Sequence, residues 1–391
     1  MKLINDIVSR QAIHGEWRRD IHAHPELAYQ EHRTAELVAE KLESFGIPIR
    51  RGIGGTGVVG TIKTGTSDRS IGVRADMDAL PLQELNSFGH CSTNDGVMHA
   101  CGHDGHTAML LAAAEHLAKE KSFDGIVHFI FQPAEEGEAG AKAMMDDGLF
   151  NDFPMESVYA VHNWPGLPVG QMALRTGPAM AAMDIFEVKV KGVGGHAALP
   201  HLTVDPIIVG AQLIQAWQNV VSRNIKAIEP AVLSVTQIHA GDAYNVIPEE
   251  VVLRGTVRCF SREVRALAEA RMEAITKGIC DSHGCSFEWR YEHRFPPTVN
   301  SARECDNAAR AAIAVCGKDN VNTNVEMVTG SEDFGYMLEE KPGCYAFIGN
   351  GPGDGGCLLH SPHFDFNDEI IPIGASYWVT LVNQMLSPTT S

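Results

Sequence analysis

The sequence predicts an α/β domain with a mostly parallel sheet covered by helices, interrupted by an inserted ferredoxin-like α+β domain. In the first part of the chain, short and nearly continuous apolar runs alternate with helical patterns, as a parallel sheet covered on both faces requires. The middle of the chain instead follows the order β-α-β-β-α-β of the ferredoxin-like split unit. We therefore expect residues 1–181 and 298–391 to form one domain and residues 182–297 to form the inserted one.

The elements of the larger domain follow from apolar spacing and from residues that end helices. Residues 18–45 carry apolar side chains at helical spacing and stop at Gly46, so we expect one helix there. Another helix separates the second and third strands, and a strand between two helices closes the domain. The expected strands are 57–62, 70–76, 125–132, 157–164 and 344–351, and the further helices are 106–119, 302–316 and 370–386.

The inserted domain has its own series of expected elements. Ser261, followed by Glu263 in the first turn, opens the second of its two helices. The expected strands are 182–190, 231–240, 250–260 and 285–295, and the first helix covers 205–219. Apolar residues make up 44% of the chain, so each domain can bury a core of its own.

Composition excludes several classes of protein. Lys and Arg number 31 against 49 Asp and Glu, a formal charge of −18, which repels nucleic-acid phosphates and anionic lipid. The sequence has no run near the ~20 apolar residues of a membrane span, and its start lacks the pattern of a signal peptide. The nine cysteines are odd in number and lack framework spacing, which indicates reduced thiols. We expect a cytoplasmic protein without nucleic-acid or membrane partners.

Polar side chains follow three of the expected strands directly. RADMDALP follows the strand at 70–76, QPAEEG places Glu135 and Glu136 after the strand at 125–132, and HNWPG places His162 at the end of another. The crevice beyond the carboxyl ends of parallel strands is where ligands bind in open α/β sheets. Three strands that deliver carboxylates and imidazole to one edge therefore predict a site.

A fourth segment, MHACGHDGHTA, precedes the helix at 106–119. Cys101 and His103 are separated by one glycine, so both side chains can point to one centre. A capping loop, with Asp104 or Thr107 as the cap, is the alternative. Because this segment is expected to lie beside the polar strand ends, we favour a metal site over a capping loop. Cys, His and Glu are the ligands that a borderline-soft divalent ion selects. LLHSPHFDFND offers His360 and His363 as further candidates.

The adjacent Glu135 and Glu136 cannot share one role, because neighbouring side chains diverge. One can bind metal while the other takes a proton from a metal-bound water as general base. A solvated acidic turn is the alternative, and the buried strand before it makes that less favoured.

The number of candidate ligands separates two mechanisms. Five candidate ligands are more than the four of a closed structural zinc, and they suit two metal ions. They are Cys101, His103, Glu136, His162 and His360. A nucleophilic triad of Cys101, His103 and Asp104 is the alternative. It is disfavoured because three residues on one loop rarely reach the geometry of a relay.

The inserted domain contributes three weaker candidates. His196 lies among glycines in KGVGGHAALPH, Asn245 lies in GDAYNVIPEE, and Arg258 ends the strand LRGTVR. Each taken alone is better explained as structural. Near the N-terminus, His22 and His24 precede a Pro–Glu helix start, and we expect them to cap or pack.

Taken together, seven collinear motifs resemble the metal-dependent amidohydrolases typified by hippurate hydrolase. This group includes bacterial N-acyl-amino-acid amidohydrolases and plant hydrolases of auxin–amino-acid conjugates, and it forms a branch of the aminoacylase/carboxypeptidase-type metallopeptidase family. The motifs are RADMDALP, MHACGHDGHTA, QPAEEG, HNWPG, KGVGGHAALPH, GSEDFGYM and LHSPHFDFND, and the resemblance covers nearly the whole chain. It implies a catalytic α/β domain and a small domain that acts as a lid and as the interface of a homodimer or a dimer-based oligomer.

Carried over position by position, the resemblance implies roles for individual residues. Glu135 would be the general base, His196 a lid histidine that stabilises the oxyanion in the partner's site, and Asn245 and Arg258 the contacts to the substrate carboxylate. Asp76 stands where the wider family has its first ligand histidine, Cys101 replaces the missing ligand, and Asp78 would orient a ligand. The implied metal ligands are Cys101, His103, Glu136, His162 and His360.

The implied reaction is hydrolysis of an N-acyl amino acid, such as hippurate, to a carboxylic acid and a free amino acid. Two divalent ions per subunit, which could be Zn²⁺, Mn²⁺, Co²⁺ or Ni²⁺, would hold a bridging water that Glu135 activates. A dipeptidase or carboxypeptidase of the same family is the alternative enzyme. An inactive metal-binding protein is the alternative from another class, and it predicts a damaged general base, whereas Glu135 is present.

Overall fold

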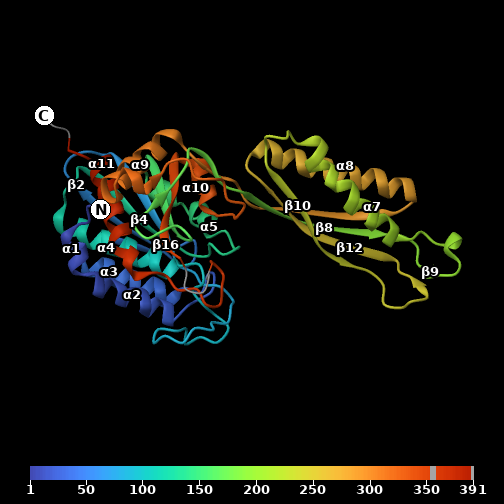
Figure 1. Cartoon of the computed structure of the whole chain (residues 1–391), viewed down its shortest axis with the longest axis horizontal. Coiled ribbons are helices and arrows are strands. Elements are labelled where there is room, and N and C mark those ends of the chain that lie inside the picture. The colour runs from blue at the N-terminus through green and yellow to red at the C-terminus, as the bar shows by residue number, and fades with distance from the viewer. Residues whose placement is uncertain (353–357, 389–391) are drawn as a thin grey trace. The chain divides into compact units, whose positions relative to one another are not determined.

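A computed structural model describes residues 1–352 and 358–388. The chain divides into two compact units (Figure 1). The large unit comprises Met1–Ala179, Val299–Glu326 and Asp333–Ser391, and the small unit comprises Met180–Thr298 and Met327–Glu332. Residues 327–332 join the small unit because Ala181 N donates hydrogen bonds to the carbonyl oxygens of Val328 and Gly330.

The large unit is built on one eight-stranded mixed sheet, with the strand order β1-β2-β4-β3-β5-β16-β6-β15. The pairs of β3 with β4, β3 with β5, β16 with β5 and β15 with β6 are parallel, and the other three pairs are antiparallel. The strands are β1 (Ile49–Ile53), β2 (Gly57–Thr64), β3 (Ser70–Asp76), β4 (Gly125–Gln132), β5 (Ser157–Pro165), β6 (Met172–Ala173), β15 (Val321–Asn322) and β16 (Gly343–Gly351). A separate short pair joins β7 (Gly177–Met180) to β14 (Thr298–Asn300).

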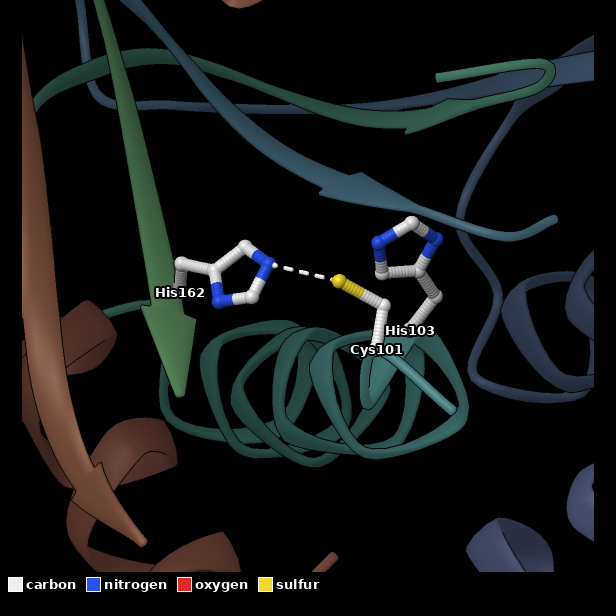
Figure 2. Close-up of side chains that lie close together, drawn as sticks. All are labelled: Cys101, His103 and His162. Carbon is white, nitrogen blue, oxygen red and sulfur yellow. Dashed lines mark hydrogen bonds between the residues drawn. The ribbon is translucent and has the colours of Figure 1, made fainter. Parts of the chain in front are cut away.

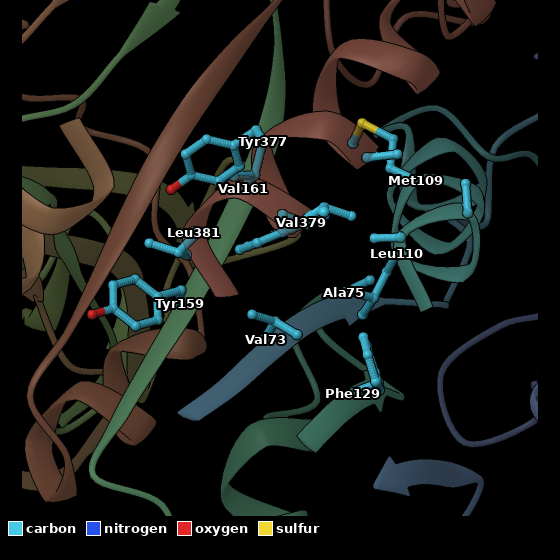
Figure 3. Packing of buried hydrophobic residues seen from close by; sticks show 14 of the residues in the cluster. Val73, Ala75, Met109, Leu110, Phe129, Tyr159, Val161, Tyr377, Val379 and Leu381 are labelled. Carbon is cyan, nitrogen blue, oxygen red and sulfur yellow. The ribbon is translucent and has the colours of Figure 1, made fainter. Parts of the chain in front are cut away.

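Helices cover this sheet and close its core. All seven residues of β3 and all nine of β16 are buried, so these strands pack on both faces, as their continuous apolar sequences predict. Figure 3 shows Val73 of β3 and Tyr159 of β5 beneath Leu110 of α4 and Leu381 of α11, all members of one buried cluster. The helices are α1 (Asn5–Ser9), α2 (Gln11–Ala23), α3 (His32–Ser44), α4 (His103–Glu120), α5 (Gly140–Asp146), α6 (Leu149–Asp152), α9 (Ala302–Cys316), α10 (Phe334–Glu340) and α11 (Ile371–Met385).

The single helix expected at 18–45 is wrong, because two helices, α2 and α3, occupy this region. The helix α2 ends at Ala23, and His24 leaves the helical conformation with φ −129° and ψ 57°. Pro25 explains the break, since proline disfavours the helical conformation of the residue before it and cannot donate a backbone hydrogen bond. Apolar spacing continued across the break and concealed it.

The small unit has a four-stranded antiparallel sheet in the order β10-β12-β8-β13. Alternate residues of β8 (Ala182–Lys191) are buried, among them Phe186, Val188 and Val190, and they share a second core with helices α7 and α8. The other elements are α7 (Pro206–Asn219), β10 (Ala231–His239), β12 (Glu250–Cys259), α8 (Arg262–His283) and β13 (Ser286–Phe295). Caps begin both helices, since Asp205 accepts from Ile207 N and Ser261 accepts from Val264 N.

Two further features complete the description of the fold. In the small unit, β9 (Gly195–His196) pairs with β11 (Val246–Ile247) as a separate two-stranded sheet. Within residues 1–352 and 358–388, no helix has the length and apolar character needed to cross a bilayer.

Candidate metal centre

The candidate site lies at the carboxyl ends of three neighbouring strands. The strands β4, β3 and β5 are adjacent and parallel, so their ends meet at one edge of the large sheet. Asp78 follows β3, the Glu135–Glu136 pair follows β4, and His162 lies near the end of β5. Cys101 and His103 come to the same edge because α4 begins at His103.

Nitrogen, sulfur and oxygen donors converge there. Cys101 Sγ lies 3.4 Å from His162 Nε2, and Figure 2 shows this contact with His103 beside it. The donor atoms of Cys101, His103 and His162 all lie within 4.8 Å of one another. Four further groups of described residues meet the same limit. Two of them are Cys101 with Glu136 and His360, and His103 with Glu135 and Glu136; the other two are Asp76 with His103 and His106, and Glu135 with Glu332 and Asp333. Cys101 and Glu136 each belong to two groups and His103 belongs to three, so the donors can surround two neighbouring centres.

Two buried donor atoms at this site fit a metal ion. Among the described residues, His103 Nε2 and Glu136 Oε1 find no hydrogen-bond partner. They lie 4.0 Å apart, and His360 Nε2 lies 3.4 Å from the same Glu136 oxygen. Leaving buried polar atoms unsatisfied costs about 1–3 kcal/mol each. A divalent cation would satisfy both atoms, and a Cys, His and carboxylate donor set suits a borderline-soft ion.

Neighbouring groups orient both buried imidazoles. His103 Nδ1 lies 2.9 Å from the carbonyl oxygen of Asp78 and 3.1 Å from its Oδ1, so this nitrogen donates and Nε2 faces the other donors. His162 Nδ1 donates to the carbonyl oxygen of Asn163 at 2.7 Å, which leaves Nε2 with a lone pair toward Cys101. Such contacts set the tautomer and the ring orientation of metal-ligating histidines.

The charges at this edge are mainly negative. Burial would lower the pKa of His103, but Asp76, Asp78 and Glu136 raise it to about 10. Burial lowers the pKa of His162 well below its usual value, so its imidazole is neutral. Histidine binds a cation as the neutral imidazole, so His162 is already in that state, whereas His103 must release a proton when a cation binds.

Asp76 and His106 form a network that sequence patterns did not indicate. His106 Nδ1 lies 2.6 Å from Asp76 Oδ1, and its Nε2 lies 2.7 Å from Asn163 Oδ1. Arg74 Nη1 donates to the other Asp76 oxygen at 2.7 Å. The donor atoms of Asp76, His103 and His106 also lie within 4.8 Å of one another. The available signal was the position of Asp76 at the end of a buried strand.

The exposed histidines of the LLHSPHFDFND segment differ in their surroundings. His360 belongs to a donor group with Cys101 and Glu136, and it adopts a left-handed φ of 63° while its N–H donates to Ala100 O at 2.7 Å. Within the described residues, His363 belongs to none of the donor groups.

The three remaining candidates lie in the small unit. His196 pairs with Val246 across the β9–β11 sheet, and Ala197 N donates to the carbonyl oxygen of Asn245 at 3.0 Å. His196 and Asn245 are therefore held on one exposed module. Arg258 lies on β12, where its guanidinium donates to the hydroxyl of Ser331.

The family model for peptidase family M20/M25/M40 matches residues 72–384. The chain belongs to this family. This M20-family hydrolase is 41% identical over 386 residues to the hippurate hydrolase of Campylobacter jejuni. The alignment covers 99% of this chain and 100% of the relative. It is 45% identical over 287 residues to the N-acyl-L-amino acid amidohydrolase of Geobacillus stearothermophilus, covering 73% of this chain and 77% of the relative.

A solved structure of the M20 family has the same fold. It is a dinuclear metal-binding peptidase from Bacillus subtilis, with a TM-score of 0.84 and 33% sequence identity. The alignment covers 97% of this chain and 99% of that one. The donor atoms gathered at the carboxyl edge of the large sheet are candidates for the ligands of a metal centre of this kind.

Proposed function

We propose that this M20-family enzyme hydrolyses the amide bond of N-acyl amino acids, with hippurate as a representative substrate. The products are a carboxylic acid and a free amino acid. The observation that carries the proposal is the pair of buried Glu135 and partly buried Glu136 beside the donors of Cys101, His103 and His162. The names of the Campylobacter jejuni and Geobacillus stearothermophilus relatives support the substrate class.

The five candidate ligands have a consistent division in this proposal. Cys101, His103, Glu136, His162 and His360 would hold two divalent ions, for which Zn²⁺, Mn²⁺, Co²⁺ and Ni²⁺ are all suitable. Bound there, the ions would polarise the substrate carbonyl and lower the pKa of water toward neutrality. Asp78 holds His103 through Nδ1 and accepts a hydrogen bond from Glu136 N at 2.8 Å. It therefore orients two ligands at once, as a supporting residue of a metal site does.

Glu135 is assigned as the general base. Its carboxylate lies within 4.8 Å of donor atoms of His103 and Glu136, and the side chain is buried. Glu135 accepts a proton from the attacking water and then delivers this proton to the nitrogen of the leaving amino acid. One group can serve both steps because the proton it takes up is the proton that the leaving amine needs.

The small unit is assigned as a lid and a dimerisation domain. His196 would donate a hydrogen bond to the oxyanion of the tetrahedral intermediate, which is a large contribution in acyl transfer. Asn245 and Arg258 would bind the carboxylate of the amino-acid part. We assign His196 to the active site of the partner subunit in a homodimer, since a two-fold interface allows each subunit to complete the other's site.

A hydrolysis screen with metal analysis tests the proposed function. Purified protein is incubated with N-benzoyl, N-acetyl and N-indoleacetyl amino acids and with dipeptides, and bound metal is measured by atomic emission. We expect hydrolysis of the N-acyl amino acids and two metal ions per chain. Preferential cleavage of dipeptides would make the protein a dipeptidase or carboxypeptidase. Full metal occupancy without hydrolysis of any substrate would make it an inactive metal-binding protein.

A further inference from the structure

The loop that carries Glu135 and Glu136 has an unusual backbone. It joins β4, which ends at Gln132, to α5, which begins at Gly140. Three of its residues adopt left-handed conformations, namely Ala134 with φ 54°, Gly137 with φ 86° and Ala139 with φ 57°. Glycine adopts this region freely, whereas alanine does so only where surrounding contacts enforce it. Ala134 directly precedes Glu135.

The two ends of this loop touch. Gly140 N donates to the carbonyl oxygen of Ala134 at 2.9 Å. A Cβ atom at Gly140 would lie 1.7 Å from the carbonyl oxygen of Pro133, so only glycine permits this closure. A tightly closed loop presents most of its backbone N–H groups outward, where other parts of the chain must accept their hydrogen bonds.

Three buried carboxylates accept those hydrogen bonds. Glu31 Oε1 accepts from Ala134 N, Asp78 Oδ2 accepts from Glu136 N, and Asp333 Oδ2 accepts from Ala141 N, each at 2.8 Å. They contact the start, the middle and the end of the loop. Asp78 is already assigned to the metal centre, whereas Glu31 and Asp333 have no role in the proposed function.

Further hydrogen bonds hold the Glu31 carboxylate. Its Oε1 also accepts from Tyr29 N at 3.0 Å, and its Oε2 accepts from the hydroxyl of Thr56. Tyr29 itself donates from its hydroxyl to the carbonyl oxygen of Glu138 at 2.8 Å. The segment between α2 and α3 thus contacts the loop at two points.

Asp333 is held by donors from the strands beneath the loop. Gln132 Nε2 lies 2.9 Å from both Asp333 oxygens, and Arg74 Nη2 donates to Oδ1 at 3.1 Å. Asp333 belongs to the GSEDFGYM motif, to which the proposed reaction assigns no role. Buried carboxylates are costly to desolvate, and charge-assisted hydrogen bonds offset that cost.

We propose that Glu31 and Asp333 are positioning residues that hold the loop backbone so that Glu135 faces the reacting atoms while Glu136 faces the metal donors. Neither residue contacts substrate or metal in this assignment, and the inference rests on the proposed function. Glu31 acts through the backbone at Ala134, whereas Asp333 acts through the backbone at Ala141 and also places a carboxylate oxygen within 4.8 Å of one of Glu135. Displacement of a catalytic group by about 1 Å can lower a rate about 100-fold, so loss of either carboxylate should lower kcat more than it changes KM.

Substitutions at Glu31 separate a positioning role from general stability. Glu31→Gln keeps an oxygen for Ala134 N and Tyr29 N, and the Thr56 hydroxyl can rotate to accept from the new amide. Glu31→Ala removes the acceptor, and Glu31→Asp keeps the charge but shortens the reach. We expect kcat to fall about 10- to 100-fold in the Ala and Asp variants, with KM changed less than about threefold, and to fall less than about threefold in Glu31→Gln.

Asp333→Asn should behave differently from Glu31→Gln. Both Asp333 oxygens accept from donors, so an amide NH₂ group must face a donor in either orientation. The isosteric change at Asp333 should therefore lower kcat about 10-fold or more, whereas that at Glu31 is tolerated. Glu304→Gln is the matched control, because Glu304 is also buried but lies on α9 and pairs with Arg303.

A readout that needs no substrate completes the test. Hydrogen–deuterium exchange of the metal-loaded variants should rise in the peptide that covers residues 133–141 in Glu31→Ala, Glu31→Asp and Asp333→Asn, and stay unchanged there in Glu31→Gln and Glu304→Gln. Unchanged exchange and unchanged kcat in folded Glu31→Asp and Asp333→Asn would overturn the proposal, as would an equal loss in Glu304→Gln. If the wild-type protein hydrolyses no amide, the proposed function fails, and the exchange results still decide whether the two carboxylates hold the loop.

Discussion

Cys101 Sγ lies 3.4 Å from Nε2 of His162, and the peptide after Cys101 turns through Gly102 with a φ of 95°. This turn brings Cys101 and His103 to the same edge of the sheet. A Cβ atom at Gly102 would lie 2.3 Å from Oδ1 of Asn163. Residue 102 must therefore be glycine both for its conformation and for the space available.

Substitution of Gly102 should damage the metal centre. Gly102→Ala forces a positive φ on alanine and a clash with Asn163, so we expect a loss of stability above about 1 kcal/mol and a clear drop in bound metal. Gly96→Ala is the matched control, because Gly96 also has a positive φ of 75° but meets no heavy atom of the described chain within 4 Å beyond its neighbours. Metal content and thermal unfolding are measured for both. Equal metal loss in the two variants would mean that strain alone, without the clash, is responsible.

Removal of metal should expose the Cys101 thiol. As a ligand, the sulfur is a thiolate shielded by the metal, so a chelator should abolish activity and accelerate alkylation of Cys101. Mass spectrometry of the alkylated peptide before and after chelation measures this change. A nucleophilic cysteine predicts the opposite pattern, in which chelator has no effect and alkylation inactivates the enzyme with its metal still bound.

The two glutamates after β4 should respond differently to the same substitution. Glu135→Gln should retain metal and lose about 10²–10⁴-fold in kcat, because a general base contributes that much. Glu136→Gln should lower metal content, since the amide is a poorer ligand than the carboxylate. Atomic emission and steady-state kinetics of both variants check the assignment. Metal loss in Glu135→Gln with full activity in Glu136→Gln would reverse the two roles.

Mixed dimers test whether His196 acts in the partner's site. His196→Ala should lower kcat about 10²–10³-fold without a change in metal content, as loss of an oxyanion donor does. Subunits with Glu135→Gln are then mixed with subunits that carry His196→Ala. With random pairing, half the dimers are mixed and half their sites are intact, so roughly a quarter of wild-type activity should return. Subunits that exchange but stay inactive would show that His196 acts within its own chain.

A buried ionic cluster beside α4 should make stability depend on pH. His22 Nδ1 lies 2.9 Å from Asp104 Oδ2, and its Nε2 lies 3.3 Å from Glu84 Oε1. Burial alone would lower the pKa of His22, but Asp104 and Glu84 raise it to about 9, compared with about 6.5 in the unfolded chain. His22 thus packs inside the fold, as expected, but it lies within α2, and the helix start expected at Pro25 is wrong because α3 begins at His32.

The raised pKa fixes the sign of this effect. Protonated His22 stabilises the fold fully below about pH 6.5, and the contribution is lost as pH rises through about 9. The difference in free energy of unfolding between wild type and His22→Gln should therefore be largest near pH 6, up to about 3 kcal/mol, and should shrink toward pH 9.5. Urea unfolding at several pH values measures it. A difference that grows with pH would contradict the assignment of a charged His22.

Local sequence patterns were enough to predict the strands of the large sheet and the position of the candidate site. Apolar runs followed at once by Glu135, Glu136 and His162 indicated strands of one sheet and a site at their carboxyl ends, because parallel strands that share a sheet deliver their ends to one edge. The spacing of Cys101 and His103 indicated two donors on one loop. The structure places the donor atoms of these residues together. Strands and candidate ligands of this kind can be predicted from sequence because the side-chain types and their periodicity are both contained in a short segment of the chain.

The tertiary structure alone decided which groups hold that site in place. Glu31 reaches Ala134 across 103 residues of sequence, and Asp333 reaches Ala141 across 192. Every residue except proline offers the same backbone N–H group, so the residue type at Ala134 or Ala141 carries no sign of the carboxylate that binds it. The same reason hid the pairing of Asp76 with His106, since a buried Asp and a helical His become partners only when β3 and α4 pack together. Sequence therefore determines which chemical groups are present, whereas the packing of distant segments determines which of them meet.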